Sequence, residues 1–233
     1  MENAQINSAL SGHIGKLLRD TFGKGPQSLH ISIKRPIIVI QMRQFLNPME
    51  HVLIDQQKED TVFQTRAVIM DKLIPEIKAF IQVIAGMEIH EFYYDWGLHN
   101  GSGVMVGVES HALDTGDGIP DEPFPGKTEL LAEIARISTQ VQKPPENLRA
   151  VLLNERTLLV FRDGVLIAIE KELIRQGYER ILKSTKRILE KKYLHNNAAL
   201  EGMLRTRIFD IFVDWDFQLD KSVMVFILKP WTP

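Results

Sequence analysis

The chain has 233 residues, of which 44% are hydrophobic and 25% charged, a composition typical of a globular protein with one large or two ordinary domains. Its 28 basic and 30 acidic side chains give a formal net charge of −2, which argues against a general nucleic-acid binder. It has no cysteine, which excludes disulfides, thiolate metal sites and cysteine nucleophiles, and no apolar run approaches the roughly 20 residues of a membrane span.

The first half of the chain alternates helical and strand patterns. Apolar residues three or four positions apart predict helices, and short runs of β-branched and aromatic residues predict strands. In chain order we expect a helix through Ile6, Leu10, Ile14 and Leu18, strands at 29–33 and 37–42, a helical stretch over 47–84 with a break near 55–58, and strands at 89–97 and 104–108.

The second half repeats this order about 120 residues later, which indicates a tandem duplication. Matching residues recur in sequence, with two one-residue slips between the copies. We expect a helix through Leu130, Ile134 and Ile137, strands at 148–153 and 157–162, a helical stretch over 167–205 with a break near 175–178, and strands at 208–217 and 223–228.

The duplication predicts two domains, at residues 1–112 and 128–233, joined by an Asp-, Gly- and Pro-rich linker at 113–127. Each copy is α-β-β-α-β-β. This is an α+β fold, in which a mainly antiparallel four-stranded sheet is covered by helices. Strand alternation places Phe92, Tyr94 and Trp96 on one face and Tyr93 on the other, so both faces carry apolar residues. We therefore expect the copies to pack as a pseudo-dimer.

Five positions recur in both copies and form a repeat signature. A proline follows the first helix, a glutamate opens the long helical stretch, a basic residue lies further along it, and an Asp-Trp pair lies in the third strand. We interpret these residues as determinants of the shared fold, with each tryptophan ring buried. They are Pro26, Glu50, Arg66, Asp95 and Trp96 in the first copy and Pro145, Glu170, Lys186, Asp214 and Trp215 in the second.

The sequence and the order of motifs in the first copy resemble those of the MpsC-like domain family. The resemblance rests on residues 23–26 ending a helix, a hairpin at 29–42, Pro48 and Glu50 opening a long helix, and Arg66 within it. It spans about residues 10–110, and a more diverged copy spans about 128–229. That second copy has Lys186 for Arg66 and Asn196 for Glu76.

The resemblance implies that each copy is a small bacterial domain. The family is named for a proposed sodium-translocating, membrane-potential-generating system. The name points to a membrane ion-transport or energy-coupling system, and it brings no catalytic residues to carry over. Since no segment is apolar enough to span a bilayer, we do not expect the chain itself to be the transporter.

The densest group of reactive side chains lies at residues 90–99 and could in principle ligate a metal. His90 and Asp95 are five positions apart in a strand and so project to opposite faces. At the positions of His90 and His99, the second copy has Phe209 and Gln218. We therefore expect no metal site and no cofactor.

One helix of the second copy is unusually basic, and four of its cations share an arc of about 80° at 100° per residue. Ile181, Leu182, Ile188 and Leu189 lie roughly opposite and are expected to face the core. The basic arc is either an ordinary solvated helix face or a docking surface for an acidic partner or anionic lipid. Its candidate partner-binding residues are Arg180, Lys183, Arg187 and Lys191.

The sequence favours an interaction protein over an enzyme. We expect a non-enzymatic accessory protein, cytoplasmic or peripheral to the membrane, that binds a protein partner such as a membrane complex and not nucleic acid. A homo-oligomer is also compatible with the sequence. The first residues lack the basic start and apolar stretch of a secretory signal. The alternative is a small-molecule binding or sensing module, with an anion or nucleotide in a cleft between the copies.

Overall fold

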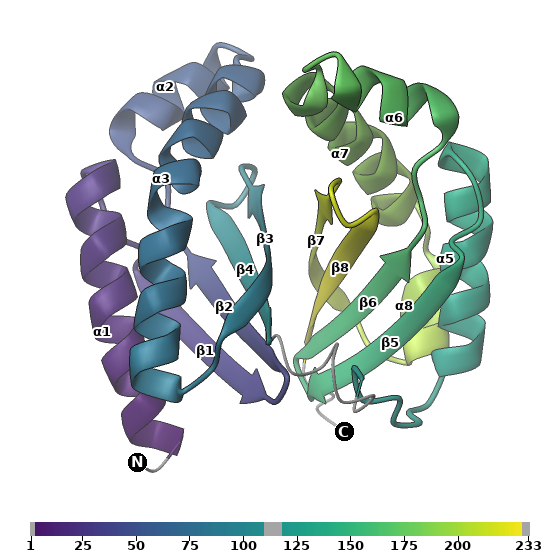
Figure 1. Ribbon diagram of the computed structural model, residues 1–233, viewed down its shortest axis with the longest axis horizontal. Helices are drawn as coiled ribbons and strands as arrows, with labels where there is room; N and C mark the ends of the chain where they lie inside the picture. The colour runs from purple at the N-terminus through teal and green to yellow at the C-terminus, as the bar shows by residue number, and fades with distance from the viewer. Residues whose placement is uncertain (1–2, 110–117, 230–233) are drawn as a thin grey trace. The chain divides into compact units, whose positions relative to one another are not determined.

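The computed structural model describes residues 3–109 and 118–229, drawn in colour in Figure 1. They divide into two units, Met1–Gly118 and Ile119–Pro233. Residues 113–117 of the expected linker lie outside the described residues. Residues 118–126 form no helix or strand, and the first helix of the second unit begins at Lys127.

The first unit follows the expected α-β-β-α-β-β order, with the long helical stretch divided in two. The four strands pair antiparallel in the order β1-β2-β4-β3, so two hairpins join through β2 and β4. The elements are α1 (Asn3–Phe22), β1 (Ser28–Lys34), β2 (Ile37–Arg43), α2 (Pro48–Asp55), α3 (Glu59–Ala85), β3 (Ile89–Gly97) and β4 (Ser102–Glu109).

The second unit has the same topology, with the antiparallel order β5-β6-β8-β7. The predicted fold class is therefore confirmed in both halves. The elements are α5 (Lys127–Val141), β5 (Asn147–Asn154), β6 (Thr157–Asp163), α6 (Ala168–Arg175), α7 (Glu179–His195), α8 (Ala199–Leu204), β7 (Ile208–Asp216) and β8 (Lys221–Leu228).

The long helix ends earlier in the second unit than in the first, a break that the sequence pattern does not reveal. In the first unit α3 continues through Pro75 to Ala85. In the second, α7 ends at His195 and α8 follows after a short turn. Asn197 stabilises this turn because its side-chain oxygen accepts a hydrogen bond from the Ala199 amide at 3.1 Å.

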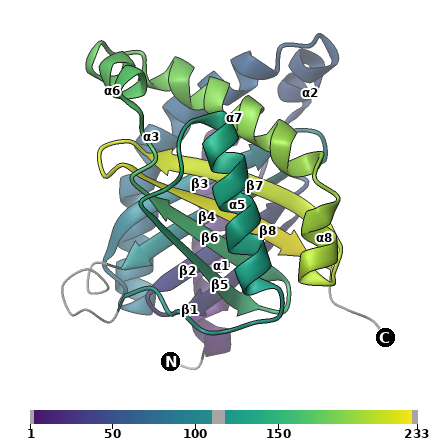
Figure 2. The ribbon, with the colours of Figure 1, turned by 90° about the vertical axis from the view of Figure 1, so that its right-hand side faces the viewer.

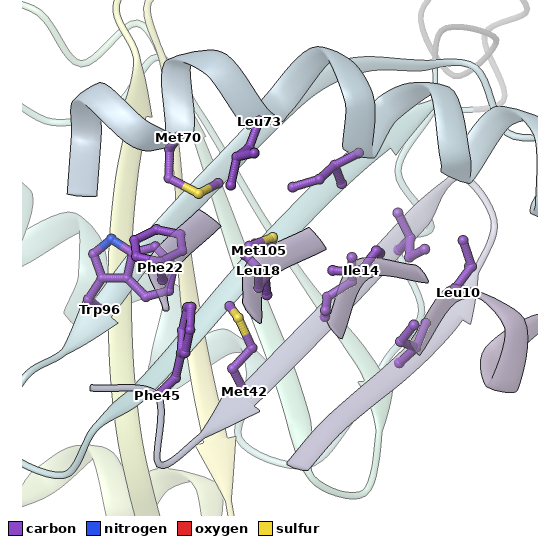
Figure 3. Packing of buried hydrophobic residues seen from close by; sticks show 14 of the residues in the cluster. Leu10, Ile14, Leu18, Phe22, Met42, Phe45, Met70, Leu73, Trp96 and Met105 are labelled. Atoms are coloured by element: carbon purple, nitrogen blue, oxygen red, sulfur yellow. The ribbon is translucent and has the colours of Figure 1, made fainter. Parts of the chain in front are cut away.

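The helices of each unit lie on one face of its sheet (Figures 1 and 2). On α1, Leu10, Ile14, Leu18 and Phe22 recur every fourth residue and so line a single face of the helix. They pack against side chains of α3 and the sheet, including Trp96 (Figure 3). Phe92 and Tyr94 contact the same core whereas Tyr93 does not, as strand alternation predicts.

The other face of each sheet is also apolar, although its residues belong to neither helix-packed core. Alternation along the strands places there a series of mostly β-branched residues. In the described part of the chain, no helix of the same unit covers this face (Figure 1). The residues are Ile37, Val39, Val104, Val106 and Val108 in the first sheet and Leu159, Phe161, Phe212, Val223 and Val225 in the second.

Gly103 provides a test of the first core, because it pairs with Trp96 across β3 and β4. A Cβ at Gly103 would lie 2.5 Å from Trp96 Cε3. We expect Gly103→Ala to lower the free energy of unfolding by about 1–3 kcal/mol in denaturant titrations. Gly12→Ala in α1 is the control, since its Cβ would meet nothing within 4 Å and alanine favours helix by about 0.5–1 kcal/mol. Equal effects of the two substitutions would contradict this packing.

Candidate functional site

Helix α7 turns a different side to the core from the one that its apolar residues suggest. Ile181, Ile188 and Leu189, expected to face the core, are 63%, 58% and 38% exposed, and only Leu182 of the expected stripe is buried. The expected orientation is wrong because charged side chains, satisfied by buried partners, occupy much of the inward face. The buried residues of α7 are Leu182, Lys186, Arg187, Glu190 and Leu194.

The four candidate partner-binding cations do not share one solvent-facing surface. They are Arg180, Lys183, Arg187 and Lys191. The Lys183 Nζ lies 2.9 Å from Asp214 Oδ1, and the buried Arg187 donates to the same oxygen at 3.4 Å. The Lys191 Nζ lies 5.5 Å from the Phe212 ring centroid, and Arg180 is exposed. The structure thus brings three of these cations to β7, the edge strand of the second sheet.

In the first unit, two residues of the repeat signature form a buried ion pair. The Arg66 Nε and Nη2 each donate to the Glu50 carboxylate at 2.8 Å, and Nη2 also donates to the Phe45 carbonyl at 2.5 Å. Glu50 in addition accepts from the Asn47 amide and so completes the N-terminal capping box of α2. One side chain thereby ties α3 to the start of α2.

Aromatic rings enclose the Arg66 guanidinium. Its Cζ lies 5.1 Å from the Phe22 ring centroid, 4.7 Å from that of Phe45 and 4.5 Å from that of Trp96. The ring faces are electron-rich and attract a cation. The sequence marks Arg66 as structural but does not reveal this cage, since its members are far apart in the chain.

The second unit retains the ion pair in altered surroundings. The Lys186 Nζ donates to Glu170 Oε1 at 2.7 Å and lies 5.5 Å from the Trp215 ring centroid. It also donates to the side-chain oxygen of Gln142, the residue that corresponds to Phe22. An ammonium is a compact donor, whereas a guanidinium is planar and stacks on rings, so the surroundings changed together with the cation.

The remaining signature residues also lie in the core, in strands or in loops of the fold. Trp96 and Trp215 are 1% and 2% exposed, as expected. Asp95 Oδ1 accepts from the Trp96 amide at 2.8 Å, which is a backbone cap, whereas Asp214 binds the α7 cations. Pro26 and Pro145 lie in the loops between the first helix and the first strand of their units.

The histidine-containing segment forms no metal cluster within residues 3–109 and 118–229, where no three His, Cys, Asp or Glu side chains gather. His90 follows the start of β3, next to a register shift between Ile89 and Glu91. His99 lies in the turn before β4.

Sequence reasoning missed a fully buried polar cluster in the second unit, the polar tetrad, formed by Ser138, Arg162, Glu190 and Ser222. The Arg162 guanidinium donates to Ser222 Oγ at 2.7 Å, to Ser138 Oγ at 3.2 Å and to Glu190 Oε2 at 2.7 Å. Both members of the ion pair have no exposed side-chain surface. Aligning the two copies would have revealed it, because the first copy has apolar residues and glycine at these four positions.

A repeated pattern of residues lies on the exposed side of the long helix in each unit. In α3, Thr65, Val68 and Lys72 are exposed, with Val68 at 55%. In α7 the corresponding residues are Thr185, Ile188 and Lys192, also exposed, with Ile188 at 58%. We call these the α3 stripe and the α7 stripe. The spacing i, i+3, i+7 keeps each set on one side of its helix.

A groove of about 530 Å³ lies in the second unit beside the turn between α7 and α8. Its lining includes Arg136 and Gln140 of α5 and Leu189 and Tyr193 of α7. In the first unit the residue corresponding to Tyr193 is Leu73, which is buried in the core. The early end of α7 thus accompanies a groove in the second copy.

The groove's electrostatics depend on Glu133, which neutralises part of its positive charge. The side-chain hydrogen bond from Arg136 lowers the pKa of Glu133, and a hydrogen bond from the Asn197 side chain acts in the same direction. Lys192, at the edge of the groove, adds a second cation. The lining therefore combines an aromatic ring, amide side chains and a modest excess of positive charge.

Two tandem copies of one helix-covered antiparallel sheet, each built around a buried carboxylate–cation pair, define a duplicated α+β protein. A family model described as "Na+-translocating membrane potential-generating system (MpsC)" matches residues 2–110 and 128–230, so the chain belongs to this family and contains its domain twice. The expected resemblance is confirmed. Within the described residues, no helix combines the length and apolar content that crossing a membrane requires.

One curated relative carries the same domain. The chain is 28% identical over 102 residues to a Bacillus subtilis (strain 168) protein named "Uncharacterized protein YbcI", a match that covers 43% of this chain and 82% of the relative. No solved structure matches the chain.

The buried ion pair of the first unit gives a stability prediction. Arg66→Met leaves the Glu50 carboxylate buried without its cation, so we expect a loss of about 3–5 kcal/mol in the free energy of unfolding. Arg19→Met, at an exposed position of α1, is the control and should change stability by less than about 0.5 kcal/mol. Similar denaturation midpoints for the two variants would show that the pair does not hold the unit together.

Proposed function

We propose that the protein is a non-enzymatic accessory protein of a membrane ion system, which binds a protein component of that system through the α3 and α7 stripes. The family description supports the link to such a system, since it matches both halves of the chain. We place the protein in the cytoplasm or at the membrane periphery. The proposed partner is a protein.

The observation that carries this proposal is the retention of the two stripes in copies where several neighbouring helix positions have changed. Threonine and lysine are identical in the two stripes, and a β-branched apolar residue lies between them. Nearby positions of the same helices have changed the sign of their charge: Asp60 corresponds to Arg180 and Asp71 to Lys191. We interpret an exposed apolar side chain that both copies keep between two identical polar residues as the centre of a contact surface.

The basic residues of α7 flank this surface. Arg180 is exposed and Lys191 half-buried, so both remain in the proposed contact. Lys183 and Arg187 contribute indirectly, because they bind Asp214 at the β7 edge. Replacing either by glutamate would place two carboxylates together and so alter folding as well as binding.

The second proposal concerns the two units themselves. We infer that the uncovered sheet faces are where they associate, as a pseudo-dimer within one chain. The support is the apolar character of each face taken by itself, since a sheet face of valine, isoleucine and phenylalanine side chains favours burial. A homo-oligomer formed through the same faces is the competing outcome.

The stripes are tested by capture of partners from membrane and soluble fractions of the native cell. Val68→Glu/Ile188→Glu should weaken recovery of a membrane-system component by about tenfold or more, because it puts a carboxylate at the centre of each contact. The control Val52→Glu/Val83→Glu also replaces two exposed valines, and the second copy already has Glu172 at the position of Val52. Equal recovery with both double variants would reject the stripes.

A small-molecule binding module remains a second candidate, which the groove beside α7 favours. Its volume of about 530 Å³ is in the usual range for ligand sites of roughly 300–1,000 Å³. Leu189 and Tyr193 offer apolar and aromatic contact, and Lys192 offers a cation for an anionic group. The corresponding ligand would be a small anion with an apolar or aromatic body, such as a nucleotide.

Thermal-shift measurements test this candidate with ATP, inorganic phosphate and bicarbonate as probes. A ligand at 100 times its Kd stabilises the native state by about 2.7 kcal/mol and so raises the Tm. Tyr193→Ala should abolish the shift, whereas Leu219→Ala, at an exposed position outside the groove, should leave it unchanged. No shift with any probe, or an equal shift in both variants, would remove the groove from consideration.

A further inference from the structure

The polar tetrad has an apolar counterpart at the same four positions of the first unit. Leu18, Met42 and Met70 lie together in the first core (Figure 3), and Gly103 pairs with Met42 across β2 and β4. In the second unit Arg162 pairs with Ser222 across β6 and β8 in the same register. The two cores thus match in geometry but differ in polarity. The correspondence is Leu18 with Ser138, Met42 with Arg162, Met70 with Glu190 and Gly103 with Ser222.

The tetrad lies across the junction between two parts of the unit. Each unit consists of a first half-unit, with one helix and a hairpin, and a second half-unit, with the long helical stretch and the other hairpin. Ser138 and Arg162 belong to the first half-unit of the second copy, and Glu190 and Ser222 to its second half-unit. The hydrogen bonds from Arg162 to Glu190 and Ser222 therefore join the two half-units.

Stability alone does not account for a buried ion pair of this kind. Taking both charges out of water costs free energy that their attraction and hydrogen bonds only offset, and apolar replacements of similar volume are often neutral or stabilising. The first copy demonstrates an apolar solution in the same fold. A buried charge without its partner is, in contrast, strongly unfavourable.

We propose that the polar tetrad matches the two half-units of the second copy to each other and so prevents half-units of the two copies from pairing in the wrong combination. In one wrong combination Glu190 would face Leu18 and Met42, which leaves a buried carboxylate without a cation. In the other, Arg162 would face Met70, which leaves a buried guanidinium without an anion. Both mismatches are penalised, whereas in the native combinations no buried charge of the tetrad lacks its counter-ion.

A duplicated chain needs such discrimination because its half-units share strand register and helix position. Tandem repeats characteristically misassemble by exchange of equivalent elements. The other buried ion pair does not distinguish the copies by charge, because a glutamate and a cation occupy the same positions in both. In the described cores, the tetrad positions differ in charge between the copies while the packing is kept.

The test gives the second unit the residues of the first in the full-length chain: Ser138→Leu/Arg162→Met/Glu190→Met/Ser222→Gly. The chain has three tryptophans, so one folded state gives three indole N–H cross-peaks. We expect wild type refolded from guanidinium to show three peaks. The quadruple variant should keep a similar denaturation midpoint but refold to a mixture, with more than three peaks and a severalfold larger fraction of dimers or larger species by light scattering.

Lys186→Arg is the matched control, because it also makes a buried residue of the second unit identical to the first but leaves the charge pattern unchanged. It should refold as wild type does. The proposal is overturned if the quadruple variant gives three peaks and, by light scattering, the same fraction of dimers or larger species as wild type. It is also overturned if that variant does not fold, since the tetrad would then be required for stability instead.

A second variant tests the proposal from the opposite direction. Leu18→Ser/Met42→Arg/Met70→Glu gives the first unit the charges of the second, with Gly103 kept because a Cβ there would meet the Trp96 ring. Both copies then carry the same pattern, and the half-units should again mispair on refolding. A single wild-type-like species from this variant would contradict the proposal. The proposal concerns folding and does not depend on the proposed function.

Discussion

A buried cation between the long helix and the start of the preceding short helix organises each unit. In the first unit Arg66 binds Glu50 and lies among three aromatic rings, and in the second Lys186 binds Glu170 and Gln142. A buried charge tolerates few arrangements, because every donor and the partner carboxylate must be satisfied. The pair thereby fixes the position of the short helix, the long helix and the strand tryptophan relative to one another.

Periodicity and the internal repeat predicted the fold, because strand alternation and helical spacing report directly on burial. The orientation of α7 was not predictable in the same way. Its inward side carries Lys186, Arg187 and Glu190, so the apolar residues Ile181 and Ile188 were wrongly assigned to the core. Charged residues that find buried partners invert the hydrophobic pattern, and those partners lie far away in the sequence. The groove depends likewise on an early helix end that no strong breaker marks.

The two copies have diverged differently inside and outside. Inside, the copies differ in matched sets: Gln142 accompanies Lys186 where Phe22 accompanies Arg66, and the polar tetrad stands where the first copy has apolar residues and glycine. Outside, most charges differ, but Thr65 and Lys72 recur as Thr185 and Lys192. The interior differences keep each unit folded and distinct from the other. The exposed stripes, in contrast, have no role in packing that would preserve them. The proposed function follows from this contrast and from the family to which the chain belongs.

Site-specific photo-crosslinking in the native cell tests the central functional claim most directly. A photoreactive phenylalanine analogue would be placed at Val68 or Ile188, with Val52 and Val83 as exposed positions outside the stripes. Docking through equivalent stripes predicts crosslinks from Val68 and Ile188 to components of one membrane system and little from the other two positions. Crosslinking to such a component from Val52 or Val83 but from neither stripe would contradict the claim.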